Sequence, residues 1–465
     1  MTPMTSMTTV TSQGLLPRRK FIFEAGLGFF GAAMSYLFAQ EAKQASPDTV
    51  APRAKSVIFL FMCGGVSHID TFDPKDSKFA GKMIDAVGFG DNQAKMLRPV
   101  IECHRTFKRY GKSGIPVSDW FPHVGQVVDE LAIVRSMFCN EIGHAPAVIE
   151  MSTGHRDRIA DHPSLGAWVS YALGSANQNL PTFVNLGRPT SPIQLNGGYL
   201  GAANGATPFR SGDSPIDHLF PPRDLTRAQQ ELRMKTLEEL NREFRERHAV
   251  EVEISGRLQA YELAARLQIE TPEVVNLSSE PKHVLDLYGI GQAETEVYGR
   301  QLLLARRLAE KGVRFIQVCH GGGGNGSWDA HSDIASHAPL CRETDLPIAG
   351  LIKDLKLRGM LDSTLIVWAS EFGRTPWSQN TKGRDHNPRG FTVWLAGGGI
   401  KGGCVHGSTD DIGYKAVENR HYLSDLQATI LHQLGLDHEK MILTVNNRPI
   451  RLVEEGFGPI REILA

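Results

Sequence analysis

Short, continuous apolar runs recur along the chain from residue 55 onward, and stretches with helical periodicity separate several of them. A strand that is buried on both faces of a parallel sheet has such an unbroken apolar run, whereas a half-exposed strand alternates between apolar and polar residues. The first run, at 56–62, ends at the pair Gly64 and Gly65, as expected where a strand turns into a loop. The same pattern predicts four further strands, at 131–135, 313–318, 364–369 and 392–396.

Amphipathic stretches between these runs predict helices at 298–310 and 346–358, the second ending at Gly359. Because strands and helices alternate, we expect an α/β fold with a doubly wound, mostly parallel sheet and helices on both of its faces. The charged stretch at 224–285 predicts an inserted helical segment. Its charges are more typical of a solvated helix face than of a binding site.

The stretch HAPAVIEMSTG, residues 144–154, predicts a buried helix that begins near Pro146 and stops at Gly154. His144 then lies just ahead of a helix N-terminus, where free N–H groups and the positive end of the helix dipole favour anions over a protonated imidazole. A neutral histidine at this position can bind a metal, attack a substrate or cap the helix. The local sequence leaves these three roles open.

Composition and charge narrow the range of partners. With 465 residues and 41% hydrophobic content, the chain can bury a large core. Its formal net charge of −1 gives no electrostatic reason to expect nucleic acid or an anionic membrane surface as a partner. The six cysteines are scattered without a CxxC pair, so we expect buried free thiols rather than a zinc knuckle or a disulfide framework.

The N-terminal segment differs from the rest of the chain. Arg18 and Arg19 precede a mildly apolar stretch rich in glycine and alanine, which predicts a twin-arginine export signal over 1–45 and a polar linker over 46–54. The stretch is too short and too rich in glycine for a membrane span. We therefore expect an exported, periplasmic or secreted protein, held at a membrane only where the signal is retained, with one domain over 55–465.

Polar and ionisable residues collect directly after the predicted strands. Ligands of α/β sheets bind at the carboxyl ends of the strands, so we expect these residues to form one site. The candidate metal ligands are Asp70, Asp329, His331, Glu371, Asp385 and His386. Asp333 and His337 form a competing ligand pair, and taken singly each aspartate or histidine also suits a turn or a helix cap.

The electrostatic repulsion between neighbouring carboxylates favours a cation among these groups. Two carboxylates about 4 Å apart repel each other by roughly 4 kcal/mol at an effective dielectric constant near 20, so they require protons, arginines or a metal ion. A mixture of imidazoles and carboxylates indicates zinc or manganese, with calcium as a further alternative. Arg374 and Arg384 are candidates to grip a substrate anion. A metal-free network of arginines and carboxylates, and a set of unrelated surface residues, are the competing interpretations.

Five segments together carry a family resemblance: GGVSHIDTFDPK, SWDAH, DSTLIVWASEFGRTP, GRDHNPRGFTVWLAGGGIKGG and SDLQATILHQLGLDH. They resemble the secreted domain-of-unknown-function family 1501, which is grouped with the alkaline phosphatase and sulfatase superfamily. The match runs from about Lys55 to the C-terminus, and the EFGRTP and GRDHNP blocks make it specific. The resemblance implies an alkaline phosphatase-like sheet with one or two metals at the strand ends, which hydrolyses phosphate or sulfate esters through a covalent nucleophile.

The superfamily pattern places His144 in the slot of the nucleophile, ahead of a helix that ends in Thr-Gly, and it makes His386 similar to a late metal histidine. The sequence also departs from that pattern. Phe372 and Glu371 stand where the superfamily has a metal histidine and an aspartate, and Asp70 would have to replace an aspartate missing from the end of the first strand. A histidine in the nucleophile slot would form a phosphohistidine, or it would bind a metal whose water attacks instead.

Two functional classes follow from these observations. The first is an exported, metal-dependent hydrolase that acts on a small anionic ester or on a sulfated or phosphorylated glycan. The second is a binding or scaffold protein that kept the sheet and lost the chemistry.

Overall fold

The computed structural model describes residues 51–87, 95–155, 161–210, 226–247, 267, 271–378, 382–445 and 447–465. The predicted export signal and most of the predicted linker therefore lie outside the described residues. Within the described part of the chain, no helix combines the length and the apolar character needed to cross a membrane.

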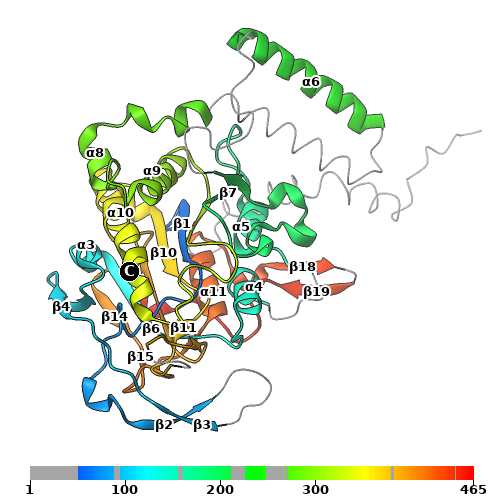
Figure 1. The fold of residues 1–465 in the computed structure, drawn as a ribbon. Coiled ribbons are helices and arrows are strands. Elements are labelled where there is room, and N and C mark those ends of the chain that lie inside the picture. The colour runs from blue at the N-terminus through cyan, green and yellow to red at the C-terminus, as the bar shows by residue number, and fades with distance from the viewer. Residues whose placement is uncertain are drawn as a thin grey trace, which may run out of the picture.

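A nine-stranded sheet forms the centre of the molecule (Figure 1). Its strands follow the order β14-β6-β13-β10-β1-β9-β7-β8, and β17 also pairs with β6. All pairs are parallel except those of β13, which runs antiparallel to both β10 and β6. The strands are β1 (Ser56–Met62), β6 (Leu131–Phe138), β7 (Phe183–Leu186), β8 (Thr207–Phe209), β9 (Phe315–His320), β10 (Thr364–Ala369), β13 (Phe391–Ala396), β14 (Cys404–His406) and β17 (His421–Tyr422).

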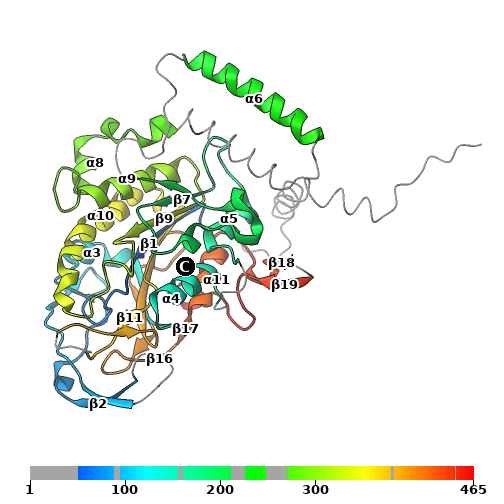
Figure 2. The same ribbon diagram turned by 45° about the vertical axis from the view of Figure 1, so that its right-hand side comes forward.

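Helices cover both faces of the sheet (Figures 1 and 2). Side chains of β1 alternate between the two faces: Ile58 and Leu60 join one core, whereas Val57 and Phe59 join the other. Both faces are buried, which explains why the strand sequences are apolar throughout. The first face packs against α3 (Pro122–Gly125), α8 (Lys282–Leu287), α9 (Glu296–Glu310) and α10 (His337–Leu357), and the second against α4 (His144–Thr153), α5 (Leu165–Leu173) and α11 (Leu423–Gln433).

Among the described residues, five two-stranded antiparallel sheets lie outside the central sheet. They are β2 (Met83–Val87) with β3 (Lys95–Pro99), β4 (Phe107–Tyr110) with β5 (Ile115–Ser118), β11 (Gly373–Arg374) with β12 (His386–Asn387), β15 (Ser408–Thr409) with β16 (Ala416–Glu418), and β18 (Ile442–Val445) with β19 (Arg448–Arg451). The pair β11 and β12 matters for the site, because it places Arg374 opposite His386.

The predicted α/β fold class is confirmed, and the strand at 364–369 has the predicted limits. The predicted start of α10 at residue 346 is wrong, because that helix begins at His337 and continues through Pro347. A proline usually starts a helix or ends one, so the sequence pattern placed the boundary beside it. Buried residues before the proline, such as Cys341 and Thr344, keep the helix packed on the sheet across that position.

The segment predicted as a helical insertion has two parts in the structure. α6 (Arg227–Arg247) stands apart from the sheet in both views, and its described side chains are almost all exposed (Figures 1 and 2). Val274 and Val284, by contrast, are buried in the core beside α9 and α10. The residues from 271 onward thus pack with the sheet domain.

The sheet order explains how distant segments meet. β6, β1, β9 and β10 all end at one edge of the sheet, and β13, being antiparallel, begins at that same edge. The loops that follow the four strands and the loop that precedes β13 therefore converge. These loops carry nearly all of the predicted site residues.

Candidate metal centre

His144 is the first residue of α4, and the helix places its ring at the edge of the sheet. Gly143 is the N-cap residue and makes no side-chain cap, while Gly154 ends the helix with a φ of 76°. The ring of His144 bonds to a carboxylate of another loop rather than to the backbone of α4. The interpretation of His144 as a helix cap is therefore wrong.

Four side chains from three loops bring their ligand atoms together: His144, Asp329, His331 and His386, whose donor atoms all lie within 4.8 Å of one another. Asp329 lies at the centre of this histidine–aspartate cluster. Its Oδ1 is 3.0 Å from His331 Nε2 and 3.4 Å from His386 Nε2, and its Oδ2 is 3.3 Å from His144 Nε2. The rings of His331 and His386, which a shared ion requires to be close, have centroids 4.6 Å apart.

Glu371 fixes the ring of His144. The carboxylate of Glu371 is fully buried and accepts hydrogen bonds from Gly64 N at 3.0 and 3.1 Å and from Ser370 Oγ at 3.0 Å. His144 Nδ1 lies 2.8 Å from the same carboxylate, so Nδ1 must be the protonated nitrogen. In a neutral ring, His144 Nε2 then presents its lone pair to the cluster.

A backbone carbonyl fixes His386 in a similar way. His386 Nδ1 donates to the carbonyl oxygen of Ile142 at 2.7 Å, which leaves the Nε2 lone pair of the neutral ring directed toward His331 Nε2, 2.9 Å away. His331 Nδ1 lies 3.7 Å from Asp385 Oδ1. His144 and His386 thus each have the other ring nitrogen hydrogen-bonded to an oxygen, an arrangement typical of metal-binding histidines, whereas the distance at His331 is too long for a hydrogen bond.

The pKa shifts describe a charged aspartate among imidazoles. Burial alone would raise the pKa of Asp329, but its contacts with three imidazoles and with Arg374 lower that pKa far below the usual range. Burial lowers the pKa of His386 to about 4. Burial would also lower the pKa of His144, but contacts with Asp329 and Glu371 outweigh it and raise that pKa.

The donor set fits a transition metal ion. Three imidazole nitrogens and one carboxylate match the ligands that zinc and manganese accept, whereas calcium prefers an all-oxygen shell. His144 Nε2 is buried and has no hydrogen-bond partner among the described residues, although it points at the cluster. An unpaired lone pair of this kind is costly to bury unless a cation or a proton occupies it.

Asp70 does not join the cluster, contrary to the predicted ligand role. Its carboxylate accepts from Arg384 Nε at 2.7 Å and Nη2 at 3.3 Å and from Ser67 Oγ at 2.5 Å. The predicted role of Arg384 in gripping a substrate does not fit either, because its guanidinium is fully buried and also donates to Thr375 O. The two form a buried ion pair in which each neutralises the other.

Arg374 lies in the site, but its guanidinium is committed to internal partners. It donates to Asp329 Oδ1 at 2.9 Å, to Gly65 O at 2.8 Å and to the carbonyls of Gly64 and Trp328. Because the side chain is fully buried, the predicted grip on a substrate anion does not fit this geometry. Arg374 instead orients Asp329 and balances its charge.

The remaining predicted ligands occupy outer positions. Glu371 and Asp385 contact the histidines of the cluster, as described above, and do not form part of the set of converging donor atoms. The competing pair is not formed: Asp333 accepts from Ala335 N at the start of a short 3-10 helix, while His337 is fully buried and accepts from Ser67 N. The loop after β9 therefore holds the ligand-like His331, and the first residue of α10, His337, is a core histidine.

Glu150, in α4, is a supporting residue that sequence reasoning did not find. Its buried carboxylate accepts from the backbone N–H groups of Asn140 and Glu141 and from the hydroxyl of Tyr422. These bonds hold the loop whose Ile142 carbonyl orients His386. A buried glutamate inside the apolar run of residues 147–151 was the signal that could have indicated it.

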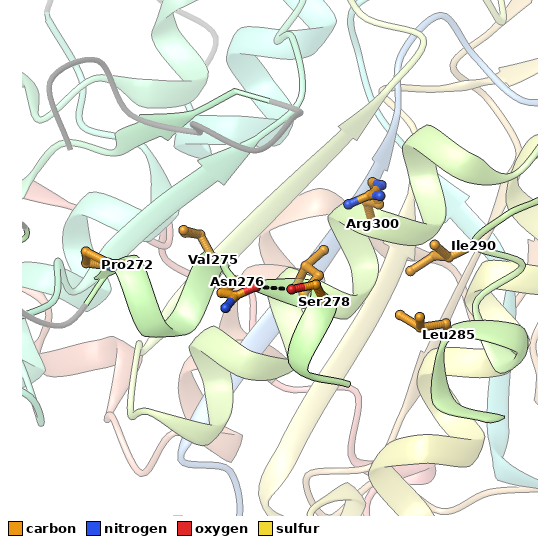
Figure 3. Close-up of a pocket in the computed structure, with 8 residues that line it drawn as sticks. Pro272, Val275, Asn276, Ser278, Leu285, Ile290 and Arg300 are labelled. Atoms are coloured by element: carbon orange, nitrogen blue, oxygen red, sulfur yellow. Dashed lines mark hydrogen bonds between the residues drawn. The ribbon is translucent and has the colours of Figure 1, made fainter. Parts of the chain in front are cut away.

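A separate cavity lies away from the histidine–aspartate cluster. A hollow of about 740 Å³ lies beside α8 and α9, and Val275, Leu285, Ile290 and Arg300 line it (Figure 3). Its described lining residues include no histidine and no carboxylate. The described lining of this cavity therefore offers no histidine or carboxylate for metal binding or general-base catalysis.

Comparison with known proteins establishes the family. The family described as "Protein of unknown function (DUF1501)" matches residues 54–464, so the chain belongs to it. No curated protein matches the chain.

The solved structures similar to this chain include a lipoteichoic acid synthase, a sulfatase and an alkaline phosphatase. The lipoteichoic acid synthase LtaP from Listeria monocytogenes is 9% identical, with 90% of this chain and 80% of that chain covered and a TM-score of 0.39. The PsFucS1 sulfatase from Pseudoalteromonas sp. is 14% identical, with 89% and 73% covered and a TM-score of 0.34. The alkaline phosphatase from the Antarctic bacterium TAB5 is 14% identical, with 82% and 98% covered and a TM-score of 0.35.

Proposed function

We propose that the protein is an exported, metal-dependent hydrolase of phosphate or sulfate esters. One observation carries the proposal: the Nε2 atoms of His144, His331 and His386 converge with the carboxylate of Asp329 at the carboxyl edge of the sheet. The outer hydrogen bonds of the first and third rings select the tautomer that a metal ligand needs. The sequence resemblance to the alkaline phosphatase and sulfatase superfamily supports the ester class of substrate.

The four residues of the cluster would hold one divalent ion, zinc or manganese rather than calcium. Such an ion supplies Lewis acidity toward an ester oxygen and lowers the pKa of a bound water toward about 7. Glu371 holds Nδ1 of His144 and Arg374 holds Asp329, so the protein sets the orientation of the donors before substrate arrives. The N-terminal N–H groups of α4 lie beside His144 and favour the anionic group of an ester.

In this proposal His144 is a metal ligand. The alternative is that His144 is the covalent nucleophile, and variants of His144 distinguish the two roles. The Nε2 atom of His144 faces Asp329 and the other rings, where a ligand atom belongs. The substrate is a small anionic ester or a sulfated or phosphorylated glycan. Arg374 and Arg384 contribute by charge balance inside the protein and not by contact with the ester.

The test combines metal analysis of the purified protein with a panel of aryl phosphate, phosphodiester and aryl sulfate substrates. We expect about one ion in the histidine–aspartate cluster and turnover of at least one ester class. Asp329→Asn should lower both metal content and turnover. An amide is neutral, and its NH2 group is a hydrogen-bond donor that cannot coordinate a cation as the carboxylate oxygen does. Asp333→Asn is the matched control in the same loop; its carboxylate caps a short helix, and an asparagine caps equally well.

Two results would contradict the proposal. A folded Asp329→Asn variant with the metal content and turnover of the parent would remove the cluster from the chemistry. A parent protein that binds the ion but hydrolyses none of the esters would instead indicate the binding or scaffold class.

A further inference from the structure

A second group of potential metal ligands lies beside β14 and β17, the two strands that pair with β6 at one side of the sheet. It consists of His406, His421 and Glu462, whose donor atoms also lie within 4.8 Å of one another. The Nε2 atoms of the two histidines are 2.9 Å apart, and Glu462 Oε2 is 4.0 Å from His406 Nε2. None of these residues belongs to the histidine–aspartate cluster, and the sequence pattern did not indicate them.

Asp425 holds the ring of His421 in place. Its Oδ2 lies 3.2 Å from His421 Nδ1 and also accepts from Tyr422 N at 3.1 Å, while its Oδ1 accepts from Gly458 N at 3.0 Å. A carboxylate only accepts, so Nδ1 of His421 carries the proton and Nε2 presents a lone pair to His406. The two rings are largely buried, with 10% and 16% of their side-chain surfaces exposed.

The three residues come from segments that are distant in the sequence. His406 ends β14 and His421 begins β17, and both strands pair with β6. Glu462 belongs to a 3-10 helix, Arg461–Ile463, three residues from the C-terminus. That terminal segment pairs with the loop before β14, since Lys401 N donates to Ile463 O at 2.8 Å and Ala465 N donates to Gly399 O at 3.0 Å.

We infer that His406, His421 and Glu462 form a second transition-metal site that ties the C-terminal segment to the edge of the sheet. Two imidazoles and a carboxylate suit a zinc-class ion, and Asp425 plays the outer role that a carboxylate has behind a metal histidine. With 62% of its side-chain surface exposed, Glu462 completes the site from the solvent side and leaves a position for water. This inference does not depend on the proposed ester hydrolysis.

Zinc binding to the chelator-treated, full-length protein tests the inference. A His331→Gln background weakens the first cluster, so that calorimetric titration with zinc alone reports mainly on the second. We expect His406→Gln and His421→Gln in this background to abolish the remaining binding or to weaken it at least about tenfold. His283→Gln, which changes an exposed histidine on α8, is the matched control and should leave zinc affinity unchanged.

Glu462→Gln keeps the inference testable even if the histidine variants fail to fold, because it changes only an exposed side chain at the surface. We expect weaker zinc binding with an unchanged melting temperature of the metal-free protein. Zinc should also slow hydrogen exchange at the Lys401 and Ala465 amides in the parent and not in the Glu462 variant. Zinc affinity equal to that of the background in both histidine variants would overturn the inference and leave the contact as a hydrogen bond between two imidazoles.

Discussion

At the scale of single residues, the two nitrogens of one imidazole have different tasks. His144 uses Nδ1 to bond Glu371 and presents Nε2 to the cluster, so its ring orientation and its tautomer are set together. His337, one loop away, is buried for packing and contacts the rings of Trp120 and Trp328. Residue type alone does not separate a ligand histidine from a core histidine, whereas the partner of each nitrogen does.

Variants of His144 distinguish a ligand from a nucleophile. We expect His144→Ala, His144→Asn and His144→Gln each to lose the ion of the histidine–aspartate cluster and turnover together, because each removes an imidazole from that donor set. Metal content by elemental analysis and ester hydrolysis are measured on the same samples. If all three variants keep the metal and lose only turnover, His144 is the covalent nucleophile.

His337 makes stability depend on pH. Burial, assisted by the charge of Arg374, lowers the pKa of His337 from 6.5 to about 3, so the folded protein keeps it neutral while the unfolded chain protonates it below about pH 6.5. The unfolded state then binds more protons, and stability falls as the pH decreases from about 6.5 toward 3. We expect this residue to cost up to about 3 kcal/mol of stability between about pH 7 and pH 4.

Thermal unfolding of His337→Gln over that pH range measures the effect. Glutamine keeps an acceptor for Ser67 N and has no proton to gain, so the variant should lose less stability in acid than the parent. His283→Gln serves as the exposed control and should follow the parent. Equal slopes for the parent and the His337 variant would show that His337 does not titrate on unfolding.

At the scale of elements, the path from β6 to α4 positions the centre. β6 ends at Phe138, the loop that follows supplies the Ile142 carbonyl to His386, and α4 then places His144. In the same region the backbone at Gly64 packs directly against the backbone at Asp329. A Cβ at Gly64, whose φ is 119°, would lie 2.7 Å from Asp329 N, so only glycine fits there. The site therefore depends on loop conformations that are fixed by buried hydrogen bonds.

Glu150→Gln should lower the metal affinity of the histidine–aspartate cluster, although Glu150 is not one of its four ligand residues. Its carboxylate accepts several hydrogen bonds that an amide can replace only in part, so we expect a loss of about 1–3 kcal/mol in stability and a roughly 10–100-fold lower metal affinity. Denaturant unfolding and metal titration report the two effects. Glu141→Gln, in the same loop, is the control; if both variants bind metal like the parent, the loop does not orient His386.

At the scale of the whole molecule, all six cysteines are free thiols. Cys63, Cys139, Cys319 and Cys341 are buried, and burial raises the pKa of Cys139 and Cys341 well above the usual value, which keeps their thiols protonated and unreactive. Export by the twin-arginine route stays a prediction, and a chain that folds in a reducing compartment before export needs no disulfides.

We expect reductant to leave the melting temperature of the full-length protein unchanged. A stabilising disulfide would contribute about 2–4 kcal/mol, which is easily seen as a shift of the unfolding transition. Mass spectrometry after alkylation under denaturing conditions should find six modified cysteines without prior reduction. A lower melting temperature in reductant, or fewer than six modified thiols, would contradict this arrangement.

Local patterns in the sequence predicted five of the nine strands of the central sheet, the helices α4 and α9 and the second half of α10, because an apolar run or a 3.6-residue period is a local property of the chain. The sequence by itself also determined that His144, Asp329, His331 and His386 follow strands, and strand ends of a parallel sheet share one edge. Only the tertiary structure decided which of the candidates meet. The order of the strands placed Asp70 against Arg384 and turned Glu371 toward His144, and it brought His406, His421 and Glu462 together from three separate segments. Such contacts depend on packing between residues that lie from 15 to 314 positions apart in the sequence, and no local pattern of the chain encodes them.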